Sequence, residues 1–126
     1  MPRAFKPHRE ERQREDRIAN EILVDAYNQS ERALSWYYYL ERRLRFPFAA
    51  RCTNLEEESP LRTHGIVQVI GLAKADRCTT QVLVKVVHGQ RSIEVPLWQL
   101  DSMASDQETN DAVADWHYWV YRAYHY

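Results

Sequence analysis

The sequence predicts one α+β domain with two N-terminal helices, a small SH3-like antiparallel sheet or barrel of four or five strands, and a C-terminal helix. Three observations support this prediction. The chain has 126 residues, enough for one domain with a core of its own. Apolar residues recur at helical spacing near both ends of the chain. Between the helical segments lie short runs rich in β-branched residues, which are typical of strands.

The first 16 residues predict no ordered structure. They carry many charges of both signs and almost nothing apolar after Phe5. Such a segment cannot bury enough apolar surface to offset the entropy cost of ordering. We therefore expect a disordered charged tail over residues 1–16 and a single domain over residues 17–126.

The first predicted helix begins after this tail. Ile18, Ile22 and Ala26 recur at helical spacing, so one side of the segment is apolar. The polar residues that follow interrupt the pattern. Among them Ser30 is a candidate N-cap for the next helix, because its hydroxyl could accept a hydrogen bond from a free backbone N–H group.

The second predicted helix contains three consecutive tyrosines. Its apolar stripe, expected to face the core, consists of Ala33, Trp36, Tyr37, Leu40 and Leu44. Tyr38 lies opposite this stripe, and Tyr39 lies on its flank. Pro47 should end the helix, since the residue before a proline is driven toward extended geometry.

Four short segments then predict the strands of the sheet. They comprise residues 48–52, 65–73, 79–87 and 91–97. In the third segment Val82, Val84 and Val86 alternate with polar residues, which predicts one buried face. The three-residue link 88–90 predicts an antiparallel hairpin between the last two segments.

The last predicted helix begins near residue 105. Ser105 and Glu108 have the spacing of a capping box, in which each side chain bonds a backbone N–H group of the other. The apolar stripe expected to be buried consists of Ala112, Trp116, Trp119, Val120 and Ala123.

Composition limits the partners of the protein. Seventeen Lys and Arg against 18 Asp and Glu give a net charge of -1, so no global positive field favours nucleic acid. No apolar run is long enough to span a membrane, and the N-terminus lacks a signal peptide. We therefore expect a cytosolic protein without membrane contact.

Neither catalysis nor zinc binding is indicated. The chain contains no nucleophile elbow, P-loop, dinucleotide fingerprint or zinc-protease motif. Cys52 and Cys78 could form a zinc site with His64 or His88, but the ligand spacing of known zinc sites is missing. We expect two reduced thiols and no enzymatic activity.

Acidic residues around the start of the last helix allow two interpretations. Asp106, Glu108 and Asn110 match the first three ligand positions of an EF-hand loop, but Asp111 replaces the required glycine and His117 the bidentate glutamate. Carboxylates here could bind a divalent cation. They could equally stabilise the exposed N–H groups of the helix end.

Four blocks of the sequence resemble the cyanobacterial calcium-binding protein family, the CcbP-like proteins. The similarity extends from about Arg9 to Val120. In order, the blocks are ILVDAYNQSERALSWYYYLERRLRFPFAARC, GIVQVIGLA, EVPLWQL and DAVADWHYWV. The resemblance implies a compact α+β domain that binds calcium through surface carboxylates, not through an EF-hand, for buffering or signalling.

The resemblance also implies which residues bind calcium. The positions that remain acidic in this chain are Glu41, Asp76, Asp106 and Glu108. Arg42, Arg43 and Arg77 stand where further acids would be expected, and each adds a positive charge near the cation. We therefore expect weakened calcium binding, with a dissociation constant on the order of 0.1 to 1 mM.

The alternative is an interaction module that has lost calcium binding. In this interpretation an arginine face meets an acidic protein or, less favourably, nucleic acid. The arginine face consists of Tyr38, Arg42, Arg43 and Arg45.

Overall fold

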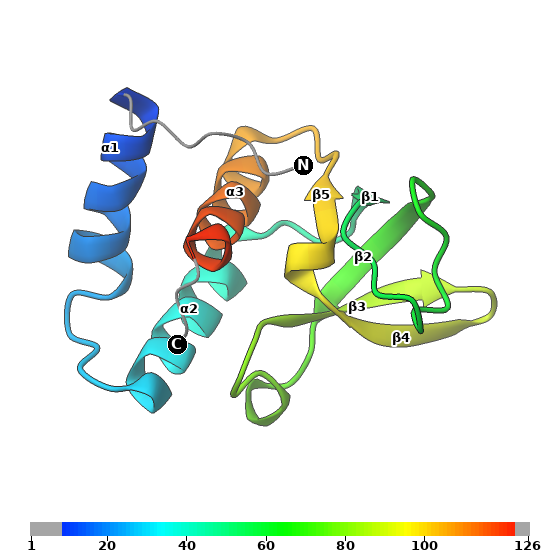
Figure 1. Ribbon diagram of the computed structural model, residues 1–126, viewed down its shortest axis with the longest axis horizontal. Coiled ribbons are helices and arrows are strands. Elements are labelled where there is room, and N and C mark those ends of the chain that lie inside the picture. Colours follow the sequence, from blue (N-terminus) through cyan, green and yellow to red (C-terminus); the bar gives the residue numbers. More distant parts are fainter. Residues whose placement is uncertain (1–8, 123–126) are drawn as a thin grey trace.

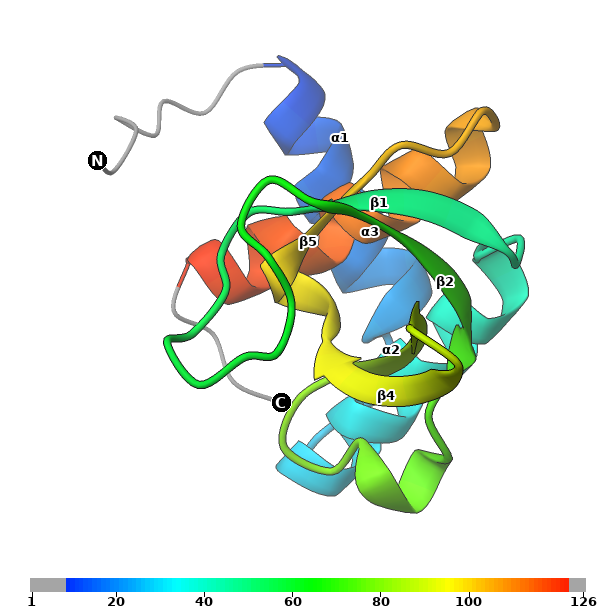
Figure 2. The ribbon, with the colours of Figure 1, turned by 90° about the vertical axis from the view of Figure 1, so that its right-hand side faces the viewer.

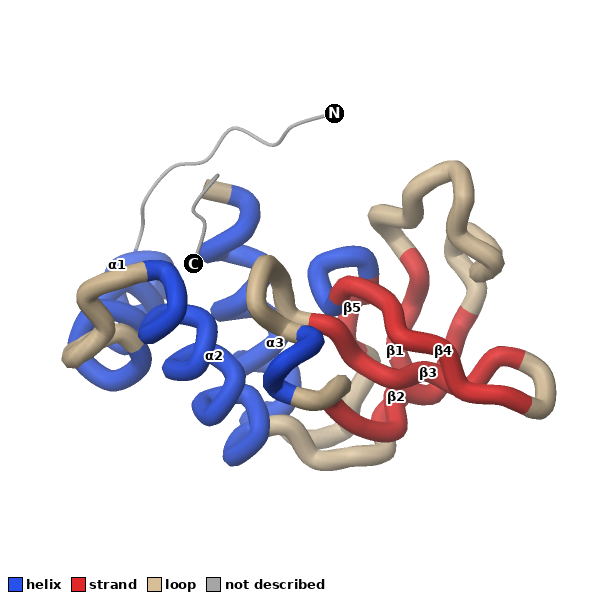
Figure 3. The backbone as a smooth tube through the Cα atoms, turned by 90° about the horizontal axis from the view of Figure 1, so that it is seen from below, coloured by secondary structure: helices blue, strands red, loops and turns tan. Residues whose placement is uncertain are grey.

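The computed structural model describes residues 9–122, with side chains from residue 11 onward. Its elements are α1 (Arg9–Arg17), the π-helical turn η1 (Ile18–Ile22), α2 (Gln29–Arg43), β1 (Phe48–Cys52), β2 (Ile66–Leu72), η2 (Ala75–Arg77), β3 (Leu83–His88), β4 (Arg91–Pro96), η3 (Leu97–Gln99), β5 (Leu100–Ser102) and α3 (Gln107–Tyr121). The three helices gather on one side of the molecule and the strands on the other (Figure 1 and Figure 3). The predicted α+β class, with two helices before an antiparallel sheet and one after it, is confirmed.

The first helix differs from the sequence-based expectation. α1 begins at Arg9, inside the segment predicted as a disordered tail, so that prediction is wrong for residues 9–16. The composition argument considered only apolar burial, whereas α1 is held to α3 by hydrogen bonds of Arg14, Arg17 and Glu15. Residues 1–8 of the predicted tail, and residues 123–126 of the predicted domain, lie outside the described residues.

The second helix begins earlier than predicted. Its N-cap is Asn28, whose side-chain oxygen accepts a hydrogen bond from the Glu31 N–H group at 2.9 Å, and not Ser30, which already lies inside the helix. Glu31 in turn accepts from the Tyr27 N–H group at 2.8 Å. The predicted buried stripe is confirmed, and Leu44 is buried just beyond the helix end. Tyr39, predicted on the flank, is buried as well.

The five strands form one antiparallel sheet in the order β4-β3-β2-β1-β5. A register shift between Val69 and Gly71 adds a bulge in β2, and bulges increase local bending and twist. The sheet is strongly curved (Figure 2), and the 3₁₀ turn η3 connects its two outer strands. This curvature agrees with the SH3-like sheet predicted from the sequence.

The β3–β4 hairpin is tighter than expected. His88 pairs with Arg91, so the connection has two residues, Gly89 and Gln90, and not three. Gly89 has a φ of 65°, which a glycine adopts without steric cost. The three valines predicted to be buried, Val82 just before β3 and Val84 and Val86 within it, are fully buried.

The third helix completes the core. Its N-cap is Asp106, one residue after the predicted cap Ser105. Ala112 and Trp116 are buried as predicted, whereas Trp119 and Val120 are only half-buried. Buried positions that the predicted stripe missed are Thr109, Val113, Asp115 and Tyr118. Ala123 lies outside the described residues.

Across residues 9–122, no helix combines the length and the apolar character that crossing a membrane requires.

Candidate functional site

The end of α2 and the start of α3 meet at a group of charged side chains. Arg45 Nη2 lies 3.3 Å from Glu108 Oε1, and Arg45 Nε lies 3.7 Å from Asp106 Oδ2. Arg43 Nη1 lies 3.8 Å from Glu108 Oε2. We call Asp106 and Glu108 the acidic helix end. Two of the predicted calcium ligands are therefore neighbours, and arginines from the predicted partner-binding face already contact them.

The backbone fixes the position of the acidic helix end. Thr109, fully buried, donates its N–H group to Asp106 Oδ2 at 2.8 Å and accepts the Arg45 N–H group on its hydroxyl oxygen at 3.0 Å. Hydrogen bonds from the Thr109 side chain and backbone lower the pKa of Asp106, and the positive charge of Arg45 lowers it further. Asp106 is therefore held ionised and in place.

The other two predicted ligands, Glu41 and Asp76, lie near Tyr37; we call them the Tyr37 pair. The Tyr37 hydroxyl donates to the Ala73 carbonyl at 2.8 Å. Glu41 lies one turn after Tyr37 on α2, and Asp76 lines the same cavity as Tyr37. Burial raises the pKa of Tyr37, and the negative charges of Glu41 and Asp76 raise it further. Both side chains are exposed, and neither forms an ion pair with another described residue.

Asp106 and Glu108 share contacts with Arg45, whereas Glu41 and Asp76 each lie near Tyr37, so the four predicted ligands do not form one cluster. Among residues 9–122, no three Asp, Glu, His or Cys side chains lie close enough together to hold a metal ion. Carboxylate oxygens are the ligands that calcium prefers, so the donor chemistry fits. Each pair supplies two carboxylates, with four oxygens at most, so waters and backbone carbonyls would have to complete the shell of six to eight oxygens that calcium takes.

The arginine face is less available than the sequence implied. Arg43 contacts Glu108 and lies over the buried Tyr39 ring, with its guanidinium carbon 5.3 Å from the ring centroid. Arg45 is engaged with the acidic helix end. Tyr38 is 48% exposed, and Arg42 is exposed. The face is therefore partly neutralised by the protein itself.

Arg77, expected to weaken calcium binding near Asp76, forms an ion pair with another carboxylate. Its Nε lies 2.8 Å from Glu94 Oε1 on β4. The hydrogen bond with Glu94 raises the pKa of Arg77, and the negative charge of the neighbouring Asp76 raises it further, so Arg77 interacts with both acids.

Two cavities lined by described residues bear on whether a cysteine and a histidine could act together in catalysis. The first lies between α1, α3 and β5 and is lined by polar residues that include Asp101, Asn110 and His117. The second lies between α2 and the loop around η2 and is lined by Tyr37, Asp76 and Cys78, among others. In the described chain, the first cavity has no cysteine lining and the second has no histidine lining. Burial raises the pKa of both Cys52 and Cys78, which makes their thiols poor nucleophiles.

His117 should make stability depend on pH. Burial lowers its pKa, although Asp101, 3.6 Å away, opposes the shift. The folded state therefore keeps this ring neutral while the unfolded state binds a proton, so stability should fall as pH drops below about 6.5. Urea unfolding at pH 7.5 and pH 5.5 should show a smaller loss for His117→Gln than for the native chain. Equal losses would contradict this prediction.

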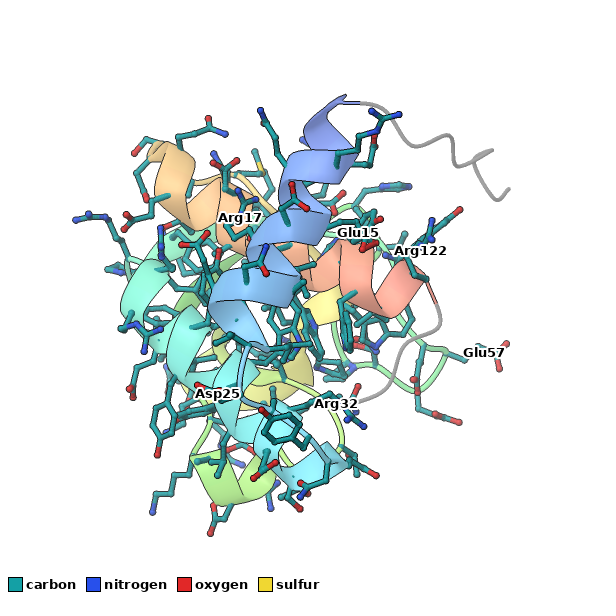
Figure 4. All side chains as sticks on the ribbon, turned by 90° about the vertical axis from the view of Figure 1, so that its left-hand side faces the viewer. Glu15, Arg17, Asp25, Arg32, Glu57 and Arg122 are labelled. Carbon is teal, nitrogen blue, oxygen red and sulfur yellow. The ribbon has the colours of Figure 1, made fainter. Side chains whose placement is uncertain are left out.

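Sequence reasoning missed the role of Asp115, the most buried charged side chain among the described residues. Asp115 is fully buried on α3 and accepts hydrogen bonds from Arg14 Nε (2.8 Å), Arg17 Nε (2.9 Å), Arg17 Nη2 (2.6 Å) and the Tyr39 hydroxyl (2.6 Å). The hydrogen bond with Asp115 raises the pKa of Arg17. The only hint in the sequence is that Asp115 directly precedes Trp116, a residue of the apolar stripe predicted for this helix. Figure 4 views the molecule from the side of α1, which lies over α3, and labels Arg17.

The fold and the site define a small α+β binding domain with exposed acidic groups at helix ends. The chain belongs to the CcbP calcium-binding family, whose model, described as calcium binding, matches residues 16–120. The crystal structure of Anabaena CcbP is 34% identical, covers 96% of this chain and 97% of its own, and superposes with a TM-score of 0.81. A calcium binding protein in its calcium-binding form is 35% identical, covers 89% and 92%, and has a TM-score of 0.76. No curated protein sequence matches the chain.

Proposed function

We propose that this protein binds calcium through exposed carboxylates, as a buffer or a signalling protein. Membership of the calcium-binding family over residues 16–120 is the observation that carries this proposal. The calcium-binding form of a relative with 35% identity supports it. The proposed ligands are the acidic helix end, Asp106 and Glu108, and the Tyr37 pair, Glu41 and Asp76.

The proposed ligands differ in how firmly the protein holds them. Asp106 is the N-cap of α3 and is held by the Thr109 N–H group, Glu108 is the second residue of the same helix, and both contact Arg45. Glu41 lies one turn after the anchored Tyr37 on α2, and Asp76 on η2 lines the same cavity as Tyr37. When bound, calcium neutralises the repulsion between neighbouring carboxylates. So few charged ligands favour a dissociation constant on the order of 0.1 to 1 mM.

We also propose that the protein binds and does not catalyse a reaction, and that it is located in the cytosol. The non-catalytic role is supported by Cys78 and His117, which line different cavities. The cytosolic location is supported by Cys52 and Cys78, which are free and buried, as expected in a reducing compartment.

Replacing both acids of the acidic helix end should weaken calcium binding by about tenfold or more, because two anionic ligands are lost. The variant is Asp106→Asn with Glu108→Gln. Asparagine caps helices as well as aspartate, so α3 should keep its start. The measurement is an amide NMR titration with calcium, repeated with magnesium at matched ionic strength.

Glu57→Gln serves as the control for loss of negative charge. Glu57 is exposed on the loop between β1 and β2 and projects away from the body of the molecule (Figure 4). It should leave the calcium affinity within about twofold. An unchanged affinity in the double variant would exclude the acidic helix end as a ligand. A native chain with no saturable calcium response up to millimolar concentration would refute the proposed function.

A further inference from the structure

We infer that the Arg45 guanidinium is a built-in competing cation that sets the calcium affinity of the acidic helix end. The inference rests on the proposed function and concerns its regulation. It assigns to Arg45 a role that differs from those of its neighbours Arg42 and Arg43.

The contacts distinguish Arg45 from the other arginines. Among the described residues, Arg45 alone contacts both carboxylates, through Nε toward Asp106 and Nη2 toward Glu108. Arg43 reaches Glu108 only, and its guanidinium also lies over the Tyr39 ring. The Arg45 side chain therefore occupies the position between Asp106 and Glu108 that a shared cation would take.

The surroundings allow this side chain to leave without disturbing the fold. The Arg45 N–H group is bound to the buried Thr109 hydroxyl, so the backbone beside the acidic helix end stays where it is. The Arg45 side chain is 68% exposed and can turn into solvent. Exchange of the guanidinium for calcium then needs a rotamer change of one side chain.

The strength of the competition follows from exposure. Ion pairs between exposed groups are weak, and each shifts the equilibrium between the paired and unpaired side chains by a factor of about 1.5 to 5. A guanidinium of like charge beside a bound cation adds a repulsion of similar size. Removing the Arg45 charge should therefore tighten calcium binding about three- to tenfold.

The test compares calcium titrations of the native chain, Arg45→Gln and Arg62→Gln at low ionic strength. Arg62 is a matched control for loss of one positive charge, because it is exposed on the loop between β1 and β2 and forms no ion pair with another described residue. We expect Arg45→Gln to bind calcium three- to tenfold more tightly, and Arg62→Gln to stay within twofold of the native chain.

A second readout follows the guanidinium directly. In the native chain the Arg45 Nε–H NMR signal should shift with calcium at the same midpoint as the amides of the acidic helix end, because calcium would take the two carboxylates that the Arg45 guanidinium contacts. A purely structural role would leave this signal unchanged.

The outcomes separate the inference from the proposed function. Calcium binding in all three proteins, with Arg45→Gln no tighter than Arg62→Gln, would overturn the inference and leave the function intact. Weaker binding by Arg45→Gln would also overturn it, because Arg45 would then be holding the carboxylates in position. Absence of a saturable response in all three proteins would refute the proposed function itself.

Discussion

Replacing the buried Asp115 by alanine is expected to lower the free energy of unfolding by about 3 kcal/mol. The change removes the common acceptor of Arg14, Arg17 and the Tyr39 hydroxyl, and leaves that buried hydroxyl without its partner. This value is at the lower end of the roughly 3 to 5 kcal/mol that breaking a buried ion pair costs. The reason is that Arg14 and Arg17 keep 20% and 27% of their side chains exposed and can turn toward water.

Urea unfolding monitored by tryptophan fluorescence measures this loss. Amide hydrogen exchange over residues 11–17 should accelerate, because the anchor of α1 is removed. Asp111→Ala on the same helix is the matched control: its carboxylate accepts a hydrogen bond from Gln107 at the surface, and its loss should cost less than about 0.5 kcal/mol. A similar small cost for Asp115→Ala would show that the network contributes little to stability.

Replacing Trp36 by alanine is expected to cost about 4 kcal/mol. Trp36 is fully buried, and its ring lies 5.1 Å from that of Trp116, 5.9 Å from that of Trp119 and 6.0 Å from that of Tyr39. The substitution opens a cavity where α2 meets α3. Denaturant unfolding of the variant and the native chain measures the difference.

A conservative variant keeps this prediction testable if Trp36→Ala does not fold. The Trp36 indole N–H is buried and has no hydrogen-bond acceptor among the described residues, so Trp36→Phe loses volume and no hydrogen bond. It should cost about 2 kcal/mol. Tyr38→Ala, two residues later on the same helix and 48% exposed, should stay within about 0.5 kcal/mol. Equal costs at Trp36 and Tyr38 would contradict the assignment of the core.

The parts of the fold that depend on apolar periodicity were predictable from the sequence. The β1 segment and the buried valines of β3 follow from alternation, and Trp36 and Leu40 follow from helical spacing. α1 was not predictable in this way, because polar contacts with residues about 100 positions later in the chain hold it. Tyr39 was misplaced for the same reason, since its buried hydroxyl depends on Asp115.

The candidate site was predictable only as a set of residue types. The resemblance supplied the four acids, and their role as ligands stays a prediction. Pairing of Arg45 with Glu108, 63 positions away, depends on how α2 and α3 meet and leaves no local pattern. The arginine that the sequence associated with Asp76, Arg77, instead pairs with Glu94 through the same kind of long-range contact.

The two outer strands of the sheet affect how the protein behaves when it is abundant. β5 has three residues and carries the exposed Asp101, while β4 carries Arg91 and Glu94 and ends at Pro96. Short, charged and proline-containing edges are poor templates for strand addition by a second molecule. These edges should therefore let the protein reach a high concentration without aggregating through its sheet.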